Sequence, residues 1–83
     1  HESDLSYVGN LSARCEVIGE EYYLSQREIE VMQLFMQGYT MSSIAKELFI
    51  SENTVKTHTR RLYSKLGINK KQQLFNLVNG RTE

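Results

Sequence analysis

Residues 50–68 read ISENTVKTHTRRLYSKLGI, and this stretch decides the fold that the sequence predicts. Four of its side chains recur at i, i+4, i+7 and i+11, which is the spacing of one face of an α-helix. These residues are Val55, Thr59, Leu62 and Leu66. Lys56 and Arg60 stand four residues apart on a different face. The pattern therefore predicts a helix from about Glu52 to Leu66 that buries one face and leaves a basic face exposed.

Both ends of this helix carry residues with known capping preferences. Ser51 is a favoured N-cap because its hydroxyl accepts a hydrogen bond from an amide of the first turn. Gly67 suits the left-handed conformation that commonly follows the last turn. The sequence thus predicts where the helix begins and where it ends.

An earlier helix is predicted to begin after Ser25 and to end at Gly38. Ser25 and Glu28 have the spacing of a capping box, in which each side chain bonds the backbone amide of the other residue. Leu24 and Ile29 stand where a hydrophobic staple would pack. The start of this helix is therefore as well marked as that of the segment after Ser51.

Two shorter helices complete the prediction. Thr40 suits the N-cap of a helix whose apolar residues are Ile44, Ala45 and Leu48. Asn69 and Gln72 repeat the cap spacing for a last helix, which stops before Gly80. Its apolar residues are Leu74, Phe75, Leu77 and Val78. Because the chain has no proline and no two-residue apolar alternation, we expect an all-α domain of four short helices.

The first part of the chain has a different character. Residues 1–24 carry one basic and five acidic side chains, whereas the remainder carries nine basic and five acidic ones. Residues 1–23 show no sustained apolar period and are predicted to be a flexible acidic linker or tail before a domain at 24–80. A turn or two of helix is the alternative, with three residues on one side: Leu11, Cys15 and Ile18.

The composition narrows the possible functions. A chain of 83 residues has room for one small domain, and its apolar runs are too short to span a membrane. Cys15 is the only cysteine and is expected to be inert, without a disulfide or zinc cluster. His1 and His58 lie in unrelated segments, and no group of ionisable residues converges as a catalytic site should. We therefore expect no metal, no cofactor and no enzyme activity, and a structural role for His58.

A short helix, a tight link and a longer helix form the layout of a helix-turn-helix, whose longer helix lies in the DNA major groove. Lysine and arginine can donate to guanine, and threonine can donate, accept or touch a thymine methyl group. The residues expected to read bases are Lys56, Thr57 and Arg60. The residues expected to contact the DNA backbone are Ser43, Ser51, Asn53, Thr54 and Arg61.

Residues 24–68, LSQREIEVMQLFMQGYTMSSIAKELFISENTVKTHTRRLYSKLGI, resemble the LuxR-type (GerE-like) helix-turn-helix. Many spaced positions agree with that pattern: Arg27, Glu28, Gly38, Ile44, Ala45, Leu48, Ser51, TVKTH at 54–58 and SKLGI at 64–68. The sequence departs from it at Ser42 and Ser43, where the family often has asparagine and lysine. Loss of that lysine predicts a modest affinity for DNA.

The resemblance implies the C-terminal domain of a bacterial transcription regulator that binds double-stranded DNA. It also implies a homodimer on DNA through the last helix, with contacts at Leu74, Leu77 and Val78, although KQQLF at 71–75 changes that face. RNA polymerase is a further candidate partner, and an upstream sensory domain is expected outside this chain. The expected location is the cytoplasm. Because residues 14–28 also resemble a junction to a membrane-embedded part, a membrane tether is the alternative.

The helical pattern leaves two alternatives, one that replaces DNA binding and one within the DNA-binding proteins. The domain could dock RNA polymerase or a receptor, with the acidic segment masking the basic face. A sigma-factor region-four-like domain shares the helical layout but not TVKTH and KLGI together. Charge reversal at Lys56 and Arg60 would separate DNA binding from protein docking.

Overall fold

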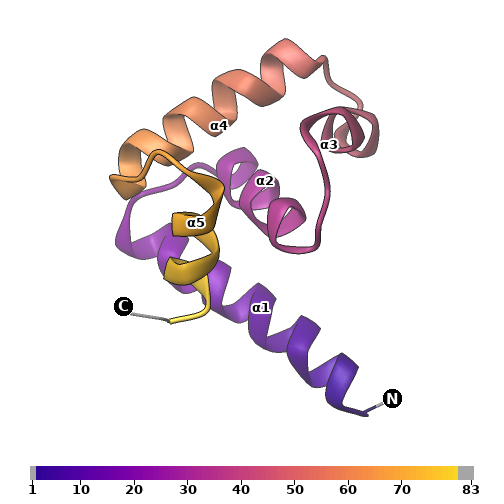
Figure 1. The fold of residues 1–83 in the computed structure, drawn as a ribbon, viewed down its shortest axis with the longest axis vertical. Coiled ribbons are helices and arrows are strands. Elements are labelled where there is room, and N and C mark those ends of the chain that lie inside the picture. Colours follow the sequence, from indigo (N-terminus) through magenta and orange to yellow (C-terminus); the bar gives the residue numbers. More distant parts are fainter. Residues whose placement is uncertain (1, 81–83) are drawn as a thin grey trace.

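The computed structural model describes the backbone of residues 2–80 and the side chains of residues 11–80. Five α-helices and no strand form within this range: α1 Glu2–Glu21, α2 Gln26–Met36, α3 Met41–Leu48, α4 Glu52–Leu66 and α5 Lys71–Val78. Figure 1 shows α4 along one side of the molecule, with α3 at its N-terminal end and α5 following its C-terminal end. The predicted all-α class is confirmed.

The local signals around α2 and α4 are confirmed in detail. The Ser25 hydroxyl accepts from the Glu28 amide at 3.2 Å, and the Glu28 carboxylate accepts from the Ser25 amide at 2.9 Å. Ser51 caps α4, and Gly67 follows its last turn with a φ of 71°, a conformation that favours glycine. These two helices therefore begin and end at residues that the sequence marks.

The core forms where α4 meets α2 and α3. All four residues of the predicted inner face of α4 are buried: Val55, Thr59, Leu62 and Leu66. α2 packs against α3 and α4, and contributes the largest fully buried side chain, Phe35. The inner face of α4 thus fixes the orientation of its opposite face relative to the domain.

The structure corrects the prediction for the N-terminal segment. Instead of a flexible linker, residues 2–21 form α1, which packs against α2 and α5. Leu11, Cys15 and Ile18 lie at i, i+4 and i+7 and are only 3%, 0% and 8% exposed, as the alternative of a short helix anticipated. Neither α1 nor any other helix of the described residues is long and apolar enough to cross a bilayer.

Gly19 allows α1 to lie close to α2. A β-carbon at this position would overlap the end of the Ile29 side chain. A larger residue would therefore force either the two helices or the Ile29 side chain to move. Gly19 is therefore a packing residue inside a helix, although glycine in a sequence usually indicates a turn or loop.

Three helix boundaries differ from what the sequence marks. Tyr23 and Phe49 follow α1 and α3 in the left-handed conformation, with φ values of 58° and 59°, although neither is glycine. The expected cap of the last helix at Asn69 with Gln72 is wrong, because α5 begins after Lys70. The Gln73 side chain instead accepts from the amides of Asn69 and Lys70 at 2.8 and 3.1 Å.

Candidate nucleic-acid interface

The outer face of α4 carries cations that form no ion pair with the described acidic side chains. Lys56, Arg60 and Arg61 are exposed, and Thr57 is half-buried among them. The two ion pairs within residues 11–80 are Glu28–Lys65 and Arg27–Glu30, so neither neutralises this face. Three positive charges without an ion-pair partner on one side of a helix can attract a polyanion.

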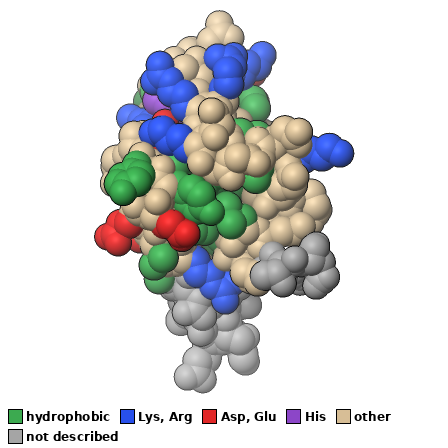
Figure 2. Space-filling view, turned by 90° about the vertical axis from the view of Figure 1, so that its left-hand side faces the viewer, with side chains coloured by type: hydrophobic (Ala, Val, Ile, Leu, Met, Phe, Trp, Pro, Cys, Tyr) green, Lys and Arg blue, Asp and Glu red, His purple; other side chains and the backbone are tan. Residues whose placement is uncertain are grey.

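The space-filling view shows the same feature on the surface. Lys and Arg side chains gather at the upper end of the molecule around a histidine, and most of the visible acidic side chains lie nearer the middle (Figure 2). The views of Figures 1 and 2 share a vertical axis, and α4 lies at this upper end in Figure 1. The basic area therefore coincides with α4.

Short hydroxyl side chains cap the N-terminus of α4. The Thr54 amide donates to the Ser51 hydroxyl at 3.1 Å, and the two hydroxyl oxygens lie 2.9 Å apart. Asn53 is exposed in the same turn. Ser51 and Thr54 thus already have one role in the fold, which is to hold the first turn of α4 in place.

A reciprocal cap at α3 was not predicted from the sequence. The Ser43 hydroxyl accepts from the Thr40 amide at 2.8 Å, and the Thr40 hydroxyl accepts from the Ser43 amide at 3.2 Å. Serine replaces the usual glutamate at the third helical position, so the spacing was present but the residue type concealed it. Ser43 therefore has a capping role in the fold that does not depend on any contact with DNA.

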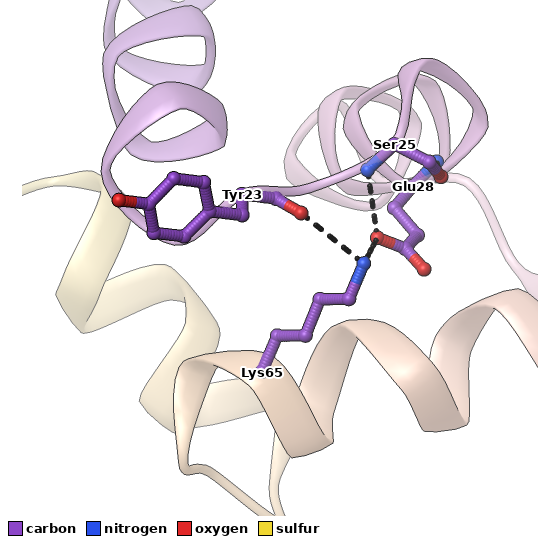
Figure 3. A network of polar contacts seen from close by, with 4 residues as sticks. All are labelled: Tyr23, Ser25, Glu28 and Lys65. Carbon is purple, nitrogen blue, oxygen red and sulfur yellow. Dashed lines mark hydrogen bonds and ion pairs between the residues drawn. The ribbon is translucent and has the colours of Figure 1, made fainter.

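A buried carboxylate ties the far end of α4 to the start of α2. Figure 3 shows Lys65 pointing from α4 between Glu28 and the Tyr23 carbonyl. The Lys65 ammonium donates to the Glu28 carboxylate at 2.8 Å and to the Tyr23 carbonyl at 3.2 Å. Glu28 thus pairs with Lys65, whereas Arg27 pairs with Glu30.

Burial of Glu28 opposes its ionisation, but hydrogen bonds from Lys65 and Ser25 outweigh this effect. Together they hold the pKa of the Glu28 carboxyl below its ordinary value of 4.5. The carboxylate is therefore charged at neutral pH and anchors α4.

His58 is half-buried beside the inner face of α4, and His1 lies outside the described residues. Within the part of the chain that the structure describes, no three His, Cys, Asp or Glu side chains lie close enough to hold a metal ion. Cys15 is buried, and burial followed by the charge of Glu16 raises the pKa of its thiol to about 11. The thiol is consequently protonated at neutral pH.

A comparison with models of protein families identifies the family that has this arrangement of helices. Residues 22–78 match the model for bacterial regulatory proteins of the luxR family, and this segment is more than half of the chain. The chain belongs to the luxR family. It therefore contains the DNA-binding helix-turn-helix domain of a bacterial transcription regulator.

Curated relatives agree with this assignment. The HTH-type transcriptional regulators MalT of Yersinia pestis (strain Pestoides F) and Serratia proteamaculans (strain 568) are each 46% identical over 50 residues. That alignment covers 60% of this chain but only 6% of either relative, so the relatives are far longer. No solved structure matches the chain.

The luxR match includes α2–α5 but not α1. It starts at residue 22, directly after α1 ends, and it contains every residue predicted to contact DNA. The packing of α1 on α2 and α5 is thus a property of this chain that the matched segment does not include.

The predicted dimer residues of this luxR domain have unequal exposure. Leu74 and Val78 are 0% and 2% exposed and belong to the core of the single chain. Leu77 is half-buried and lines an open groove of about 380 Å³ between α1 and α5. Leu77 is the most exposed of the three, although Val78 also lines the groove, and the dimer interface stays a prediction.

Proposed function

We propose that α4 enters the major groove of double-stranded DNA with Lys56, Thr57 and Arg60 facing the base edges. The observation that carries this proposal is the division of α4 into a buried inner face and a basic outer face. The major groove of B-DNA is wide enough for an α-helix, and lysine and arginine donate to guanine O6 and N7. A rigidly held helix presents these donors in a fixed register.

The N-terminal turns of α3 and α4 are proposed to hold the DNA backbone. Amide groups at a helix N-terminus attract phosphate, because they carry partial positive charge and the first few lack helical partners. The residues proposed to contact the backbone are Ser43, Ser51, Asn53, Thr54 and Arg61. Such contacts set the position of α4 on the duplex and carry no base preference themselves.

The same domain is proposed to place a longer regulator at a promoter. The MalT relatives are named transcriptional regulators and extend far beyond the matched segment. We therefore propose a sensory domain outside this chain, a homodimer on DNA, and RNA polymerase as a further partner. The half-buried Leu77 on α5 is the residue of the predicted dimer set that supports this dimer.

A salt series tests the DNA contact. Fluorescence anisotropy with a generic duplex would compare the chain with Lys56→Ala/Arg60→Ala. On a generic duplex neither side chain meets its preferred bases, so both act mainly as positive charges near the phosphates, and each one lost should reduce the slope of log affinity against log salt by at most about one. We expect a weaker affinity and a shallower slope for the variant.

The matched control is Arg14→Ala/Lys70→Ala, which removes two exposed cations from α1 and the α4–α5 link. It should keep the slope close to that of the original chain, since these residues lie off α4. Equal losses in both variants would show that net charge, and not the α4 face, governs binding. Charge reversal at Lys56 and Arg60 without any change in duplex affinity would favour the protein-docking alternative.

A further inference from the structure

The threonine hydroxyls in the middle of α4 are bonded within the helix. The Thr57 hydroxyl donates to the Asn53 carbonyl at 3.1 Å, and the buried Thr59 hydroxyl donates to the Val55 carbonyl at 2.8 Å. A threonine hydroxyl carries a single hydrogen. Thr57 therefore cannot donate to a base while this bond is intact.

The same bond fixes the direction of the Thr57 side chain. Threonine is β-branched, and its χ1 angle is restricted to staggered positions. With the hydroxyl turned back to the Asn53 carbonyl of the preceding turn, the γ-methyl group must occupy a different staggered position. Thr57 is half-buried and follows Lys56 one turn before Arg60, so its methyl group belongs to the turn of α4 that carries both exposed cations.

We infer that Thr57 recognises the 5-methyl group of a thymine through its own γ-methyl group. This inference rests on the proposed function, in which α4 lies in the major groove. Thymine is the base that presents a methyl group there, whereas lysine and arginine favour guanine. The preferred duplex therefore contains a thymine next to positions that Lys56 and Arg60 read as guanine.

The first experiment needs no variant. The whole chain selects duplexes from a library with a randomised core, and the enriched duplex is remade with each thymine in turn replaced by deoxyuridine. Deoxyuridine lacks the 5-methyl group but keeps every hydrogen-bonding group. We expect a loss of about fourfold in affinity at one thymine per half-site, the ratio for one buried carbon group.

A pair of variants then identifies the residue. Thr57→Val keeps the methyl group without the hydroxyl, and should bind within about twofold of the original chain and still distinguish thymine from uracil. Thr57→Ser keeps the hydroxyl without the methyl, and should bind the thymine duplex about fourfold more weakly and no longer distinguish the two bases. Thermal melting is the control that tests whether both variants are folded.

Two results would overturn the inference. One is enrichment of a duplex whose affinity is insensitive to uracil at every thymine, which leaves the proposed function intact. The other is a loss of affinity in Thr57→Val with no loss in Thr57→Ser, which would assign the contact to the hydroxyl. A library without enriched duplexes would instead contradict the proposed function, and this inference with it.

Discussion

The two longest helices, α1 and α4, are held in place by different means. α4 begins after a serine cap, ends before a glycine and buries four residues on one face. α1 ends at Glu21 and is followed by Tyr23 in the left-handed conformation, and Leu11, Cys15 and Ile18 dock its second half. The position of α4 is thus specified both locally and by packing, whereas docking of α1 depends on the surfaces of α2 and α5.

On α4 itself, the residues that stabilise the fold and the residues proposed to bind DNA lie on different faces. The inner face forms the core, and Lys65 at the last turn is tied to Glu28 and Tyr23. The proposed DNA contacts occupy the outer face near the first turns. Substitutions on the two faces should therefore change different measurements.

The largest effect is expected for Leu62→Ala on the inner face of α4. Leu62 is fully buried, so its truncation should leave a cavity and lower the free energy of unfolding by about 2–5 kcal/mol. Urea denaturation followed by circular dichroism would measure this loss. The control is Leu77→Ala, at a half-buried position, which should lower the free energy of unfolding by less. An equal loss in the two variants would contradict the assigned core.

A smaller loss is expected for Gly19→Ala, which places a methyl group against the Ile29 side chain. Because the end of that side chain can move, the expected destabilisation is about 1–3 kcal/mol. Cys15 reports whether α1 stays docked, since its buried thiol with a pKa raised to about 11 should react slowly with Ellman's reagent.

Gly19→Ala should therefore increase the rate of Cys15 modification, which rises as α1 separates from α2. Glu20→Ala changes the exposed neighbour of Gly19 and should leave the rate unchanged. Fast modification of the original chain at neutral pH would show that α1 is not docked in solution.

The Glu28–Lys65 contact should contribute about 1 kcal/mol, because Lys65 is partly exposed and solvent screens the pair. The pKa of Glu28 is depressed by folding, so its contribution is present above pH 4.5 and is lost as pH falls through the lower folded value. Glu28→Gln should be less stable at neutral pH and should lose less stability on acidification. Parallel pH profiles for the two proteins would argue against this contact.

The smallest effect on stability is expected for Lys56→Ala/Arg60→Ala. Both residues are exposed and unpaired with any described acidic residue, so the free energy of unfolding should stay within about 0.5 kcal/mol. A change in DNA affinity without a change in melting temperature would separate the outer face of α4 from its inner face. A large drop in melting temperature would show that the two faces are coupled.

The sequence predicted best those helices whose ends are marked by capping residues. Ser25 with Glu28, and Ser51 with Gly67, mark helices through bonds to nearby backbone groups, and these bonds need no distant partner. The ends of α1 and α3 were harder to predict, because Tyr23 and Phe49 adopt a conformation that usually indicates glycine. The cap of α5 was misplaced by one residue because Gln73, rather than Asn69, bonds the free amides.

The sequence by itself determined the four helices of the luxR segment and the two faces of α4, since capping and a 3.6-residue apolar period are local properties. Only the tertiary structure decided that the acidic first segment is a docked helix. Burial of three α1 side chains and the close approach at Gly19 stabilise α1 only when α2 and α5 supply the matching surface. The same reason places Leu74 and Val78 in the core, because apolar spacing indicates a buried face but does not name what covers it.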